Sequence, residues 1–357
     1  MERAEALAMV RRLAVDVHEP TAGTWDGEAR VSAPAILPGK RDRWLAARRQ
    51  HVTASDVAAI LGEDPRRGPL AIYLSKVSDI EPEDTLPMRR GRRFEAAIGE
   101  EYAEQTGRMV FAVPEYELLP HPSIPWLAAT LDRKTVGSLG LPDPFGGISP
   151  HGPPFTTGDV KPGTLIGERA PLQIKMALGS ASDWKDEPPL AYAVQVTIEM
   201  ACAEATWGAL CGMVGPGPLK TFDLPRNDAF LEAALPKLEE FWLRVQRREP
   251  PEADGLPGTT EAIKALWADE DGETIPLDAD ALQLADDLEM ARARVAAASA
   301  TVEELQNKLR ARMGSASFGA LTDGSFLTLK TTRRKGYVVE PTEYRALRRW
   351  WPRIRRR

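Results

Sequence analysis

The chain has 357 residues and a formal net charge of −6, a length that suffices for two domains with cores of their own and without stabilising metals or disulfides. Cys202 and Cys211 are the only cysteines, which excludes a disulfide framework, a four-cysteine zinc site and a four-cysteine iron–sulfur cluster and favours a reducing compartment. No run approaches 18 apolar residues and the N-terminus is charged, so we expect a cytoplasmic protein with no membrane span and no signal peptide.

Residues 1–40 are expected to form an N-terminal extension, because a short helical stretch precedes an arm rich in Pro and Gly. From residue 41 the pattern is that of a globular domain. It predicts a helix through Trp44 and a second helix that begins near Thr53 or Ser55 and stops at Gly62.

The segment GRRFEAAIGEEYAEQTG predicts a longer helix that ends at Gly107, because its apolar residues recur at helical spacing. Strand-like runs lie at 109–113, 127–132, 172–177, 207–214 and 219–224, with further helices expected at 192–203 and 227–248. Pro or Gly occupies 11 of the 23 positions in 141–163, which indicates an inserted surface loop. Residues 41–250 are therefore expected to form an α/β (α+β) core with a mixed central sheet flanked by helices.

Residues 251–275 are expected to be a linker, followed by a C-terminal segment over 276–357 with a long helix, a β-hairpin and a basic tail. Residues 330–357 contain eleven Lys and Arg against two Glu, a net charge of +9, which leaves −15 for residues 1–329. A basic tail suits a polyanionic partner, although a solvated end explains the charge equally well. A scaffold built on the long helix would explain nothing about the first 250 residues.

Two strand-like segments carry groups suited to phosphodiester cleavage. LAATLDRKT contains Asp132, and APLQIKMAL places Gln173 and Lys175 two residues apart, on one face of a strand. Phosphodiester cleavage with Mg²⁺ needs hard oxygen ligands and a cation near the attacked phosphate. A nuclease would be expected to have Glu at position 173, because its charged carboxylate holds the metal. The amide oxygen of Gln has nearly the same shape and no charge.

Five segments, RRQHVTASDVAAILG, RGRRFEAAIGEEY, ATLDR, LQIKMA and YAVQVTIEM, together with Trp184, resemble the YqaJ-type viral recombinases. This family includes phage lambda exonuclease and RecE and belongs to the PD-(D/E)xK nuclease superfamily. The similarity runs in order over about residues 41–250, and the linker, long helix and hairpin resemble the C-terminal segments of many members. The resemblance implies a restriction-endonuclease-like core with a C-terminal extension.

The resemblance also implies a role for each matching residue. Asp132, Gln173 and the backbone carbonyl of Ile174 match metal-binding positions, and Glu95 matches a helix Glu that lines the metal site. Lys175 matches the motif Lys that positions the attacking water and stabilises charge on the phosphate.

Three further residues have counterparts in the family. Gln195 matches the Gln of the motif that follows the catalytic strands, and Arg48 and Ser55 match the residues that hold the terminal 5′-phosphate. A phosphate at this place also has a physical basis, because a helix opening at Ser55 would present free backbone N–H groups and Arg48 would add a two-pronged donor.

Each of these residues also has a purely structural explanation. Ser55 is explained as a helix N-cap, and Glu95 as part of a solvated acidic helix face. Lys175 is explained as a strand lysine whose stem reaches to solvent. Gln195, which shares a helix face with Glu199, is explained as a buried polar residue.

A competing PD…DxK pattern consists of Pro142-Asp143 followed by Asp159 and Lys161, and its acid is intact. This pattern lies in the Pro- and Gly-rich insertion, whereas Gln173 lies in a strand-like run, and the geometry of an active site needs rigid support. In a third arrangement, Asp159 approaches the main site and supplies the missing charge.

The resemblance implies a Mg²⁺-dependent 5′→3′ exonuclease of a phage or prophage recombination system, with Mn²⁺ as a substitute metal. It would act on double-stranded DNA ends and leave a 3′ single strand for a single-strand annealing protein. Family members form rings, which implies a trimeric or tetrameric homo-oligomer. Gln173 indicates an engineered Glu→Gln change or a naturally weakened member, with activity well below that of the Glu form. The alternative is a non-catalytic DNA-end-binding protein of the same fold.

Overall fold

The computed structural model describes residues 41–78, 85–136, 169–177, 184, 187–270, 272–333, 347 and 349. The chain divides into two compact units, with Leu266 in one and Trp267 in the other. The N-terminal extension and the competing pattern at Asp143, Asp159 and Lys161 lie outside the described residues.

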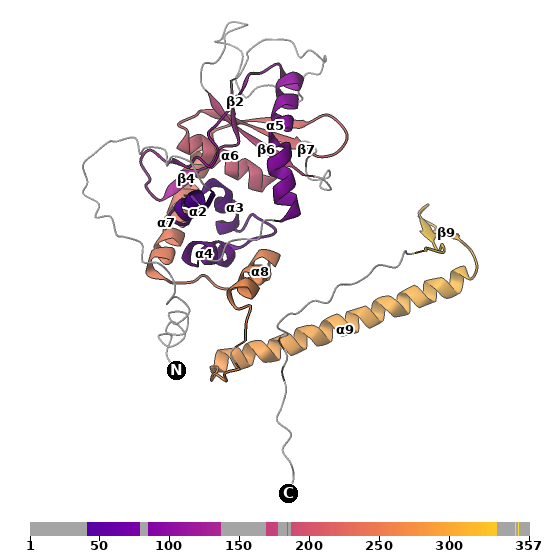
Figure 1. Cartoon of the computed structure of the whole chain (residues 1–357). Helices are drawn as coiled ribbons and strands as arrows, with labels where there is room; N and C mark the ends of the chain where they lie inside the picture. The colour runs from indigo at the N-terminus through magenta and orange to yellow at the C-terminus, as the bar shows by residue number, and fades with distance from the viewer. Residues whose placement is uncertain are drawn as a thin grey trace. The chain divides into compact units, whose positions relative to one another are not determined.

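A five-stranded sheet forms the centre of the unit that ends at Leu266 (Figure 1). Its strand order is β2 (Val110–Ala112), β5 (Arg133–Thr135), β6 (Ala170–Met176), β7 (Trp207–Met213) and β8 (Lys220–Pro225). β6 and β7 are parallel, with Gln173 opposite Leu210, whereas the other neighbouring pairs are antiparallel. This mixed sheet confirms the predicted α/β class.

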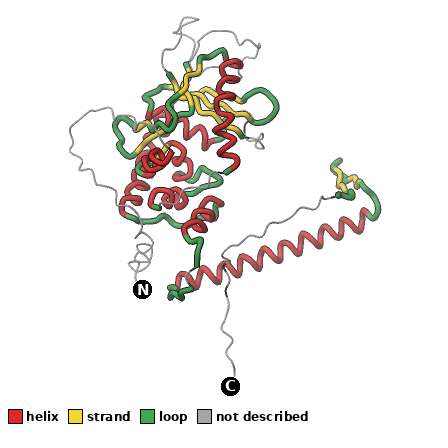
Figure 2. The backbone as a smooth tube through the Cα atoms, viewed as in Figure 1, coloured by secondary structure: helices red, strands yellow, loops and turns green. Residues whose placement is uncertain are grey.

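Helices cover both faces of this sheet, as Figure 2 shows. On one face, α5 (Leu86–Thr106) packs Ile98 and Tyr102 against β6 and β7. On the other face, α6 (Leu190–Cys202) packs against β7 and β8. α5 ends before Gly107, whose φ of 66° is a left-handed conformation that favours glycine and stops a helix.

Side chains along β6 alternate between these two helices. Ile174 belongs to the core under α5, whereas Gln173 and Lys175 both contact Gln195 of α6. The strand period of two residues thus places the two polar side chains of the QIK motif on the same side.

A second core lies on the side of α6 that faces away from the large sheet. It joins α6 to α3 (Ala54–Ile60), α4 (Pro69–Val77) and α7 (Asp228–Arg247) and to a small sheet of β1 (Val52–Thr53), β4 (Leu127–Ala129) and β3 (Leu119–Pro120). α2 (Arg41–Arg49) has no buried residue and contacts α4 and β1. β1 is parallel to β4, with Thr53 opposite Ala128. The segments that follow β1 and β4 therefore start next to each other.

The strand expected over 127–132 ends three residues early, at Ala129. β4 ends at Ala129 and belongs to the small sheet, whereas β5 starts at Arg133 and belongs to the large sheet. Asp132 consequently lies in the bend between the two sheets. The sequence predicts it at the end of one strand, and this prediction is wrong.

Part of the stretch expected as a linker is helical. α8 (Pro257–Leu266) contacts α4, and the Gly258 N–H donates a hydrogen bond of 2.7 Å to the carbonyl of Arg66. This helix belongs to the same unit as the two sheets.

The unit that contains residues 267–357 consists, in its described part, of a long helix and a hairpin. α9 (Ala279–Met313) precedes the antiparallel strands β9 (Phe318–Ala320) and β10 (Phe326–Thr328). α9 has no buried residue, and its apolar side chains, such as Leu284 and Val295, are exposed. None of the helices in the described ranges is both long and apolar enough to cross a membrane.

Candidate active site

Gln173 of β6 is held in a chain of hydrogen bonds. Its amide nitrogen donates to Asp132 Oδ2 and, at 3.3 Å, to the carbonyl oxygen of Ile174, while its Oε1 accepts from Gln195 Nε2 at 2.6 Å. The Ile174 backbone N–H also donates to Asp132 Oδ2, at 2.8 Å. The side chain is almost fully buried, and its partners on both sides fix which way the amide points.

Gln195 of α6 connects this chain to Lys175 and to a further acid. Its Oε1 accepts from Lys175 Nζ at 3.0 Å, and its Nε2 also donates to Glu199 Oε1 at 2.8 Å. The Lys175 ammonium lies 4.9 Å from the centre of the Tyr192 ring. Because the amide oxygen faces a cation and the amide nitrogen faces two acceptors, Gln195 has one favourable orientation.

Glu199 is a site residue that the sequence motifs do not identify. It is fully buried, and its Oε2 has no hydrogen-bond partner among the described residues. Burial and the nearby Asp132 raise the pKa of Glu199 well above its ordinary value. The only signal in the sequence is its spacing of four residues from Gln195, which places both on one helix face.

Glu95 approaches Asp132 from α5. Glu95 Oε1 lies 2.8 Å from Arg133 Nη1. Burial and then the charge of Asp132 raise the pKa of Glu95 to about 7, although Arg133 opposes the shift. Burial also raises the pKa of Asp132, against the attraction of Lys175. We call Glu95, Asp132, Gln173, Lys175, Gln195 and Glu199 the acidic centre.

The donor atoms of the acidic centre fit Mg²⁺ in their chemistry. Mg²⁺ takes hard oxygen ligands and needs only one or two carboxylates when water and phosphate complete its shell. The carboxylates of Asp132 and Glu95 and the carbonyl of Ile174 are such ligands. Burial raises the pKa of both acids because it disfavours their charged form, and a bound cation would favour that form.

The weak point of this donor set is residue 173. Gln173 turns its amide nitrogen, which cannot be a ligand, toward Asp132 and the Ile174 carbonyl. Across the described ranges, no group of three or more His, Cys, Asp or Glu could hold a metal ion by itself. Gln173 itself would be a metal ligand only if its amide turned its oxygen toward Asp132.

Arg48 and Ser55, the predicted phosphate ligands, are in direct contact. Arg48 Nη2 donates to Ser55 Oγ at 2.9 Å and to Thr53 Oγ1 at 3.2 Å. The Arg48 guanidinium also lies 4.6 Å from the centre of the Trp44 ring. Thr53, and not Ser55, is the N-cap of α3, and Asp56 Oδ2 accepts from its backbone N–H at 2.9 Å.

Two cations that the sequence does not identify complete this region. Arg67 Nη2 donates to the Ser55 carbonyl at 2.7 Å, and Lys76 Nζ lies 2.7 Å from Asp56 Oδ2 in a pair whose side chains are 4% and 5% exposed. Burial favours the neutral form of Asp56, yet Lys76, Arg48 and Arg67 together hold its pKa well below the ordinary value. We call Arg48, Ser55, Asp56, Arg67 and Lys76 the cationic corner.

The cationic corner has a positive surplus even when its acids are counted. Its three cations face Asp56 and, through a 3.1 Å pair with Arg67, Asp64. A guanidinium with a hydroxyl at its side is a suitable receptor for a phosphate group.

The cationic corner and the acidic centre are connected through β4. Thr53 of β1 pairs with Ala128, and Trp44 Nε1 donates to Thr130 Oγ1 at 3.0 Å, two residues before Asp132. The structure thus brings all of the predicted site residues into two groups that are linked by one short strand.

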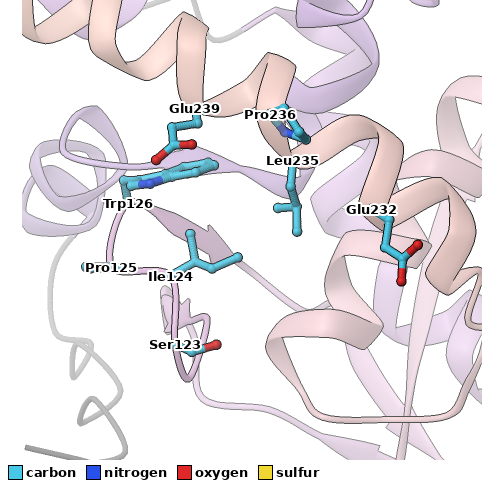
Figure 3. Close-up of a pocket in the computed structure, with 8 residues that line it drawn as sticks. All are labelled: Ser123, Ile124, Pro125, Trp126, Glu232, Leu235, Pro236 and Glu239. Atoms are coloured by element: carbon cyan, nitrogen blue, oxygen red, sulfur yellow. The ribbon is translucent and has the colours of Figure 1, made fainter.

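A hollow on the surface of the same unit lies between residues 123–126 and α7 (Figure 3). Ile124, Trp126 and Leu235 give it an apolar lining, and Glu232 and Glu239 add two carboxylates. None of its lining residues belongs to the acidic centre or to the cationic corner. Its carboxylates would repel phosphate, so the hollow is unsuited to the DNA backbone.

Known proteins are similar to this chain in sequence or in structure. The protein YqaJ of Bacillus subtilis (strain 168) is 22% identical over 287 residues, which cover 78% of this chain and 80% of YqaJ. Crystal structures of the alkaline exonuclease LHK-Exo from Laribacter hongkongensis, and of LHK-Exo in complex with dAMP, are 19% identical and cover 58% of this chain and 94% of theirs, with TM-scores of 0.39 and 0.40. Residues 43–206 match the family model of the YqaJ-like viral recombinase domain. This family is the one that the sequence motifs of the chain resemble.

Proposed function

We propose that this chain is a Mg²⁺-dependent exonuclease that degrades double-stranded DNA from its 5′ ends, with Mn²⁺ as a substitute metal. The observation that carries the proposal is the hydrogen-bonded cluster of Asp132, Gln173, Lys175 and Gln195. Its link to the cationic corner through β4 supports an end-directed reaction. The match of residues 43–206 to the YqaJ-like family model agrees with a role in viral recombination.

The acidic centre would hold the metal through Asp132, the carbonyl of Ile174 and Glu95, with residue 173 as the weakest ligand. A metal bound there supplies positive charge that polarises the attacked phosphate and its water. Lys175 orients the attacking water and places its ammonium beside the phosphate oxygens. Gln195 keeps that ammonium in position through its 3.0 Å hydrogen bond.

The cationic corner would bind the terminal 5′-phosphate. Arg48 offers two N–H donors, Ser55 offers a hydroxyl, and Arg67 adds charge beside them. A terminal phosphate carries more negative charge than an internal phosphodiester, so this corner favours a chain end over a continuous strand. Degradation would then start at the 5′ end and leave a 3′ single strand.

The first half of α5 offers a surface for the DNA backbone. Arg89, Arg90, Arg92 and Arg93 are exposed and precede Glu95 on this helix. Such a cluster attracts phosphates without regard to base sequence. The proposal includes a single-strand annealing protein as the recipient of the 3′ strand and a ring-shaped trimer or tetramer that would keep the enzyme on its DNA.

The test is nucleotide release from a linear duplex that carries a 5′-phosphate and a label at the same end. We expect labelled mononucleotide with Mg²⁺ and slower release from the matching 5′-hydroxyl duplex. Lys175→Met is the control, because it removes the ammonium that faces the phosphate and leaves the cationic corner intact. Release that does not exceed that of Lys175→Met with either metal would overturn the proposal.

The second candidate is a DNA-end-binding protein without cleavage. It is favoured by one observation, that the Gln173 amide nitrogen donates to both Asp132 and the Ile174 carbonyl. Binding of the 5′-phosphorylated duplex in preference to the 5′-hydroxyl duplex, with no release in Mg²⁺ or Mn²⁺, would establish this candidate.

A further inference from the structure

Glu199 is a buried acid that the proposed reaction does not use. Its side chain is 0% exposed, and one of its two oxygens has no hydrogen-bond partner among the described residues. Removing a carboxylate from water without full compensation is unfavourable, and buried polar atoms in folded proteins nearly always have partners. An unpartnered oxygen at this depth therefore requires an explanation.

The surroundings of Glu199 belong to the acidic centre. One amide nitrogen, Nε2 of Gln195, donates to Glu199 Oε1 at 2.8 Å and to Gln173 Oε1 at 2.6 Å. Asp132 and Lys175 are close enough to act on the pKa of Glu199 in opposite directions, after the larger effect of burial. Glu199 is thus linked to Gln173 through the side chain of Gln195, and it interacts electrostatically with Asp132.

Residues 173 and 199 have complementary chemistry. The strand position where the resembled family has a metal-binding Glu carries the neutral Gln173, whereas the helix position carries an acid. The Gln195 N–H₂ can donate to an amide oxygen and to a carboxylate oxygen alike. Carboxylates at both positions would place two buried anions on one neutral donor beside Asp132, and such like charges disfavour each other's ionised form.

We propose that Glu199 supplies the negative charge that residue 173 lacks, and that it acts through Gln195 on the cation bound at Asp132. Gln173 and Glu199 are then a coupled amide–carboxylate pair, and Glu199 is a positioning residue and not a metal ligand. The inference rests on the proposed function, because the charge acts on a divalent cation. The coupling also changes what is expected of Gln173→Glu. By itself, this substitution adds a third buried acid to Asp132 and Glu199.

Four forms of the full chain test the pair: the natural chain, Gln173→Glu, Glu199→Gln and the double variant with both changes. The probe is Mn²⁺ alone, titrated without DNA and followed by electron paramagnetic resonance. We expect Glu199→Gln to weaken Mn²⁺ binding by about 10- to 100-fold, the effect of losing an outer partner of a metal site. The double variant, which keeps the total charge, should bind Mn²⁺ at least as tightly as the natural chain.

Thermal unfolding of the metal-free forms provides the second measurement. Gln173→Glu should lower Tm by several degrees, because it adds a buried carboxylate next to Asp132 and Glu199. The double variant should recover most of that loss, because the added acid is offset by the removed one. This recovery is the non-additivity expected of residues that share one network.

Three outcomes would overturn the pair. The first is a Mn²⁺ affinity unchanged by Glu199→Gln, and the second is additive effects of the two changes on both measurements. The third is the absence of Mn²⁺ binding in all four forms. If Glu199→Gln fails to fold, Glu199→Asp takes its place, since it keeps the charge and should retain Mn²⁺ binding that a neutral residue loses.

Failure of the proposed function gives a different result. Suppose that the two changes have non-additive effects on Mn²⁺ affinity and Tm but none of the four forms releases nucleotides. This result would reject the exonuclease and retain the coupling of Gln173 with Glu199. Nucleotide release with additive effects would reject the pair and retain the exonuclease.

Discussion

The cationic corner and the acidic centre differ in the sign of their charge surplus and in how completely their polar groups are paired. In the corner, Arg48, Asp56 and Lys76 all have close partners. In the centre, Glu199 has an oxygen without a partner among the described residues, and the pKa values of Glu95 and Asp132 are raised by burial. The polar groups of the corner are therefore paired within the chain, whereas an added cation would offset the remaining negative charge of the centre.

Under the proposed function, this difference suits each region to one part of a DNA end. A complete, positively charged corner suits a phosphate that binds without rearrangement, which would fix the position of the 5′ end. An acidic centre suits a metal ion and, through it, the neighbouring phosphodiester. Each prediction below perturbs one of the two regions.

The largest expected effect is the loss of stability on removal of Asp56. Asp56→Ala leaves Lys76 buried without its carboxylate, and breaking a buried pair in this way costs about 3–5 kcal/mol. Urea denaturation measures the change. The matched control is Glu240→Ala, whose pair with Arg244 is 69% and 44% exposed and should contribute no more than about 1 kcal/mol. Equal losses in the two variants would show that the corner is not held by its buried pair.

Removal of Arg48 should have the next largest effect, and it should act on DNA binding. Arg48→Ala removes the two-pronged donor beside Ser55, so we expect the preference for a 5′-phosphate over a 5′-hydroxyl duplex to fall by about 1.5–3 kcal/mol. Fluorescence anisotropy with the two duplexes gives this difference directly. Arg43→Ala, a change of the same kind at an exposed position of α2, is the control. A preference that survives in Arg48→Ala would place the 5′-phosphate elsewhere.

The smallest expected effect is a pH dependence caused by His51, at the edge of the corner. Burial and the nearby Lys76 lower the pKa of His51, although its 2.8 Å hydrogen bond to the Ala47 carbonyl opposes the shift. The folded protein thus binds this proton less readily than the unfolded chain. The stability that depends on neutral His51 is present above the ordinary pKa of about 6.5 and is lost as the pH falls through the lower folded value.

The measurement is the free energy of unfolding of the natural chain and of His51→Gln across this pH range. The natural chain should lose more free energy of unfolding than the variant on acidification. Parallel curves would show that His51 does not contribute. Asp and Glu residues that titrate in both proteins cancel in this comparison.

Sequence reasoning is most successful where local pattern decides the structure. Alternation around Gln173 predicts β6, and helical spacing with Gly107 at the end predicts α5. Asp132 is misplaced within its segment, because the change from one sheet to the other depends on the partners of β4 and β5, which lie elsewhere in the chain.

Two of the site residues that the sequence misses, Arg67 and Lys76, have no motif around them. Arg67 and Lys76 join Ser55 and Asp56 from separate segments of the chain, and only the packing of α4 on α3 brings Lys76 to its partner. Glu199 does have a weak signal, since it lies one helical turn after Gln195. Its full burial, which gives that spacing a meaning, depends on the packing of α6 between the large sheet and the second core and not on any local pattern.

The most direct test of the two-region account is a crystal of the chain with a 5′-phosphorylated duplex, soaked in Mn²⁺ and measured at the manganese absorption edge. The account predicts an anomalous peak next to Asp132 and the Ile174 carbonyl, together with the terminal phosphate against Arg48 and Ser55. A phosphate bound away from Arg48, or manganese bound only away from Asp132, would contradict it.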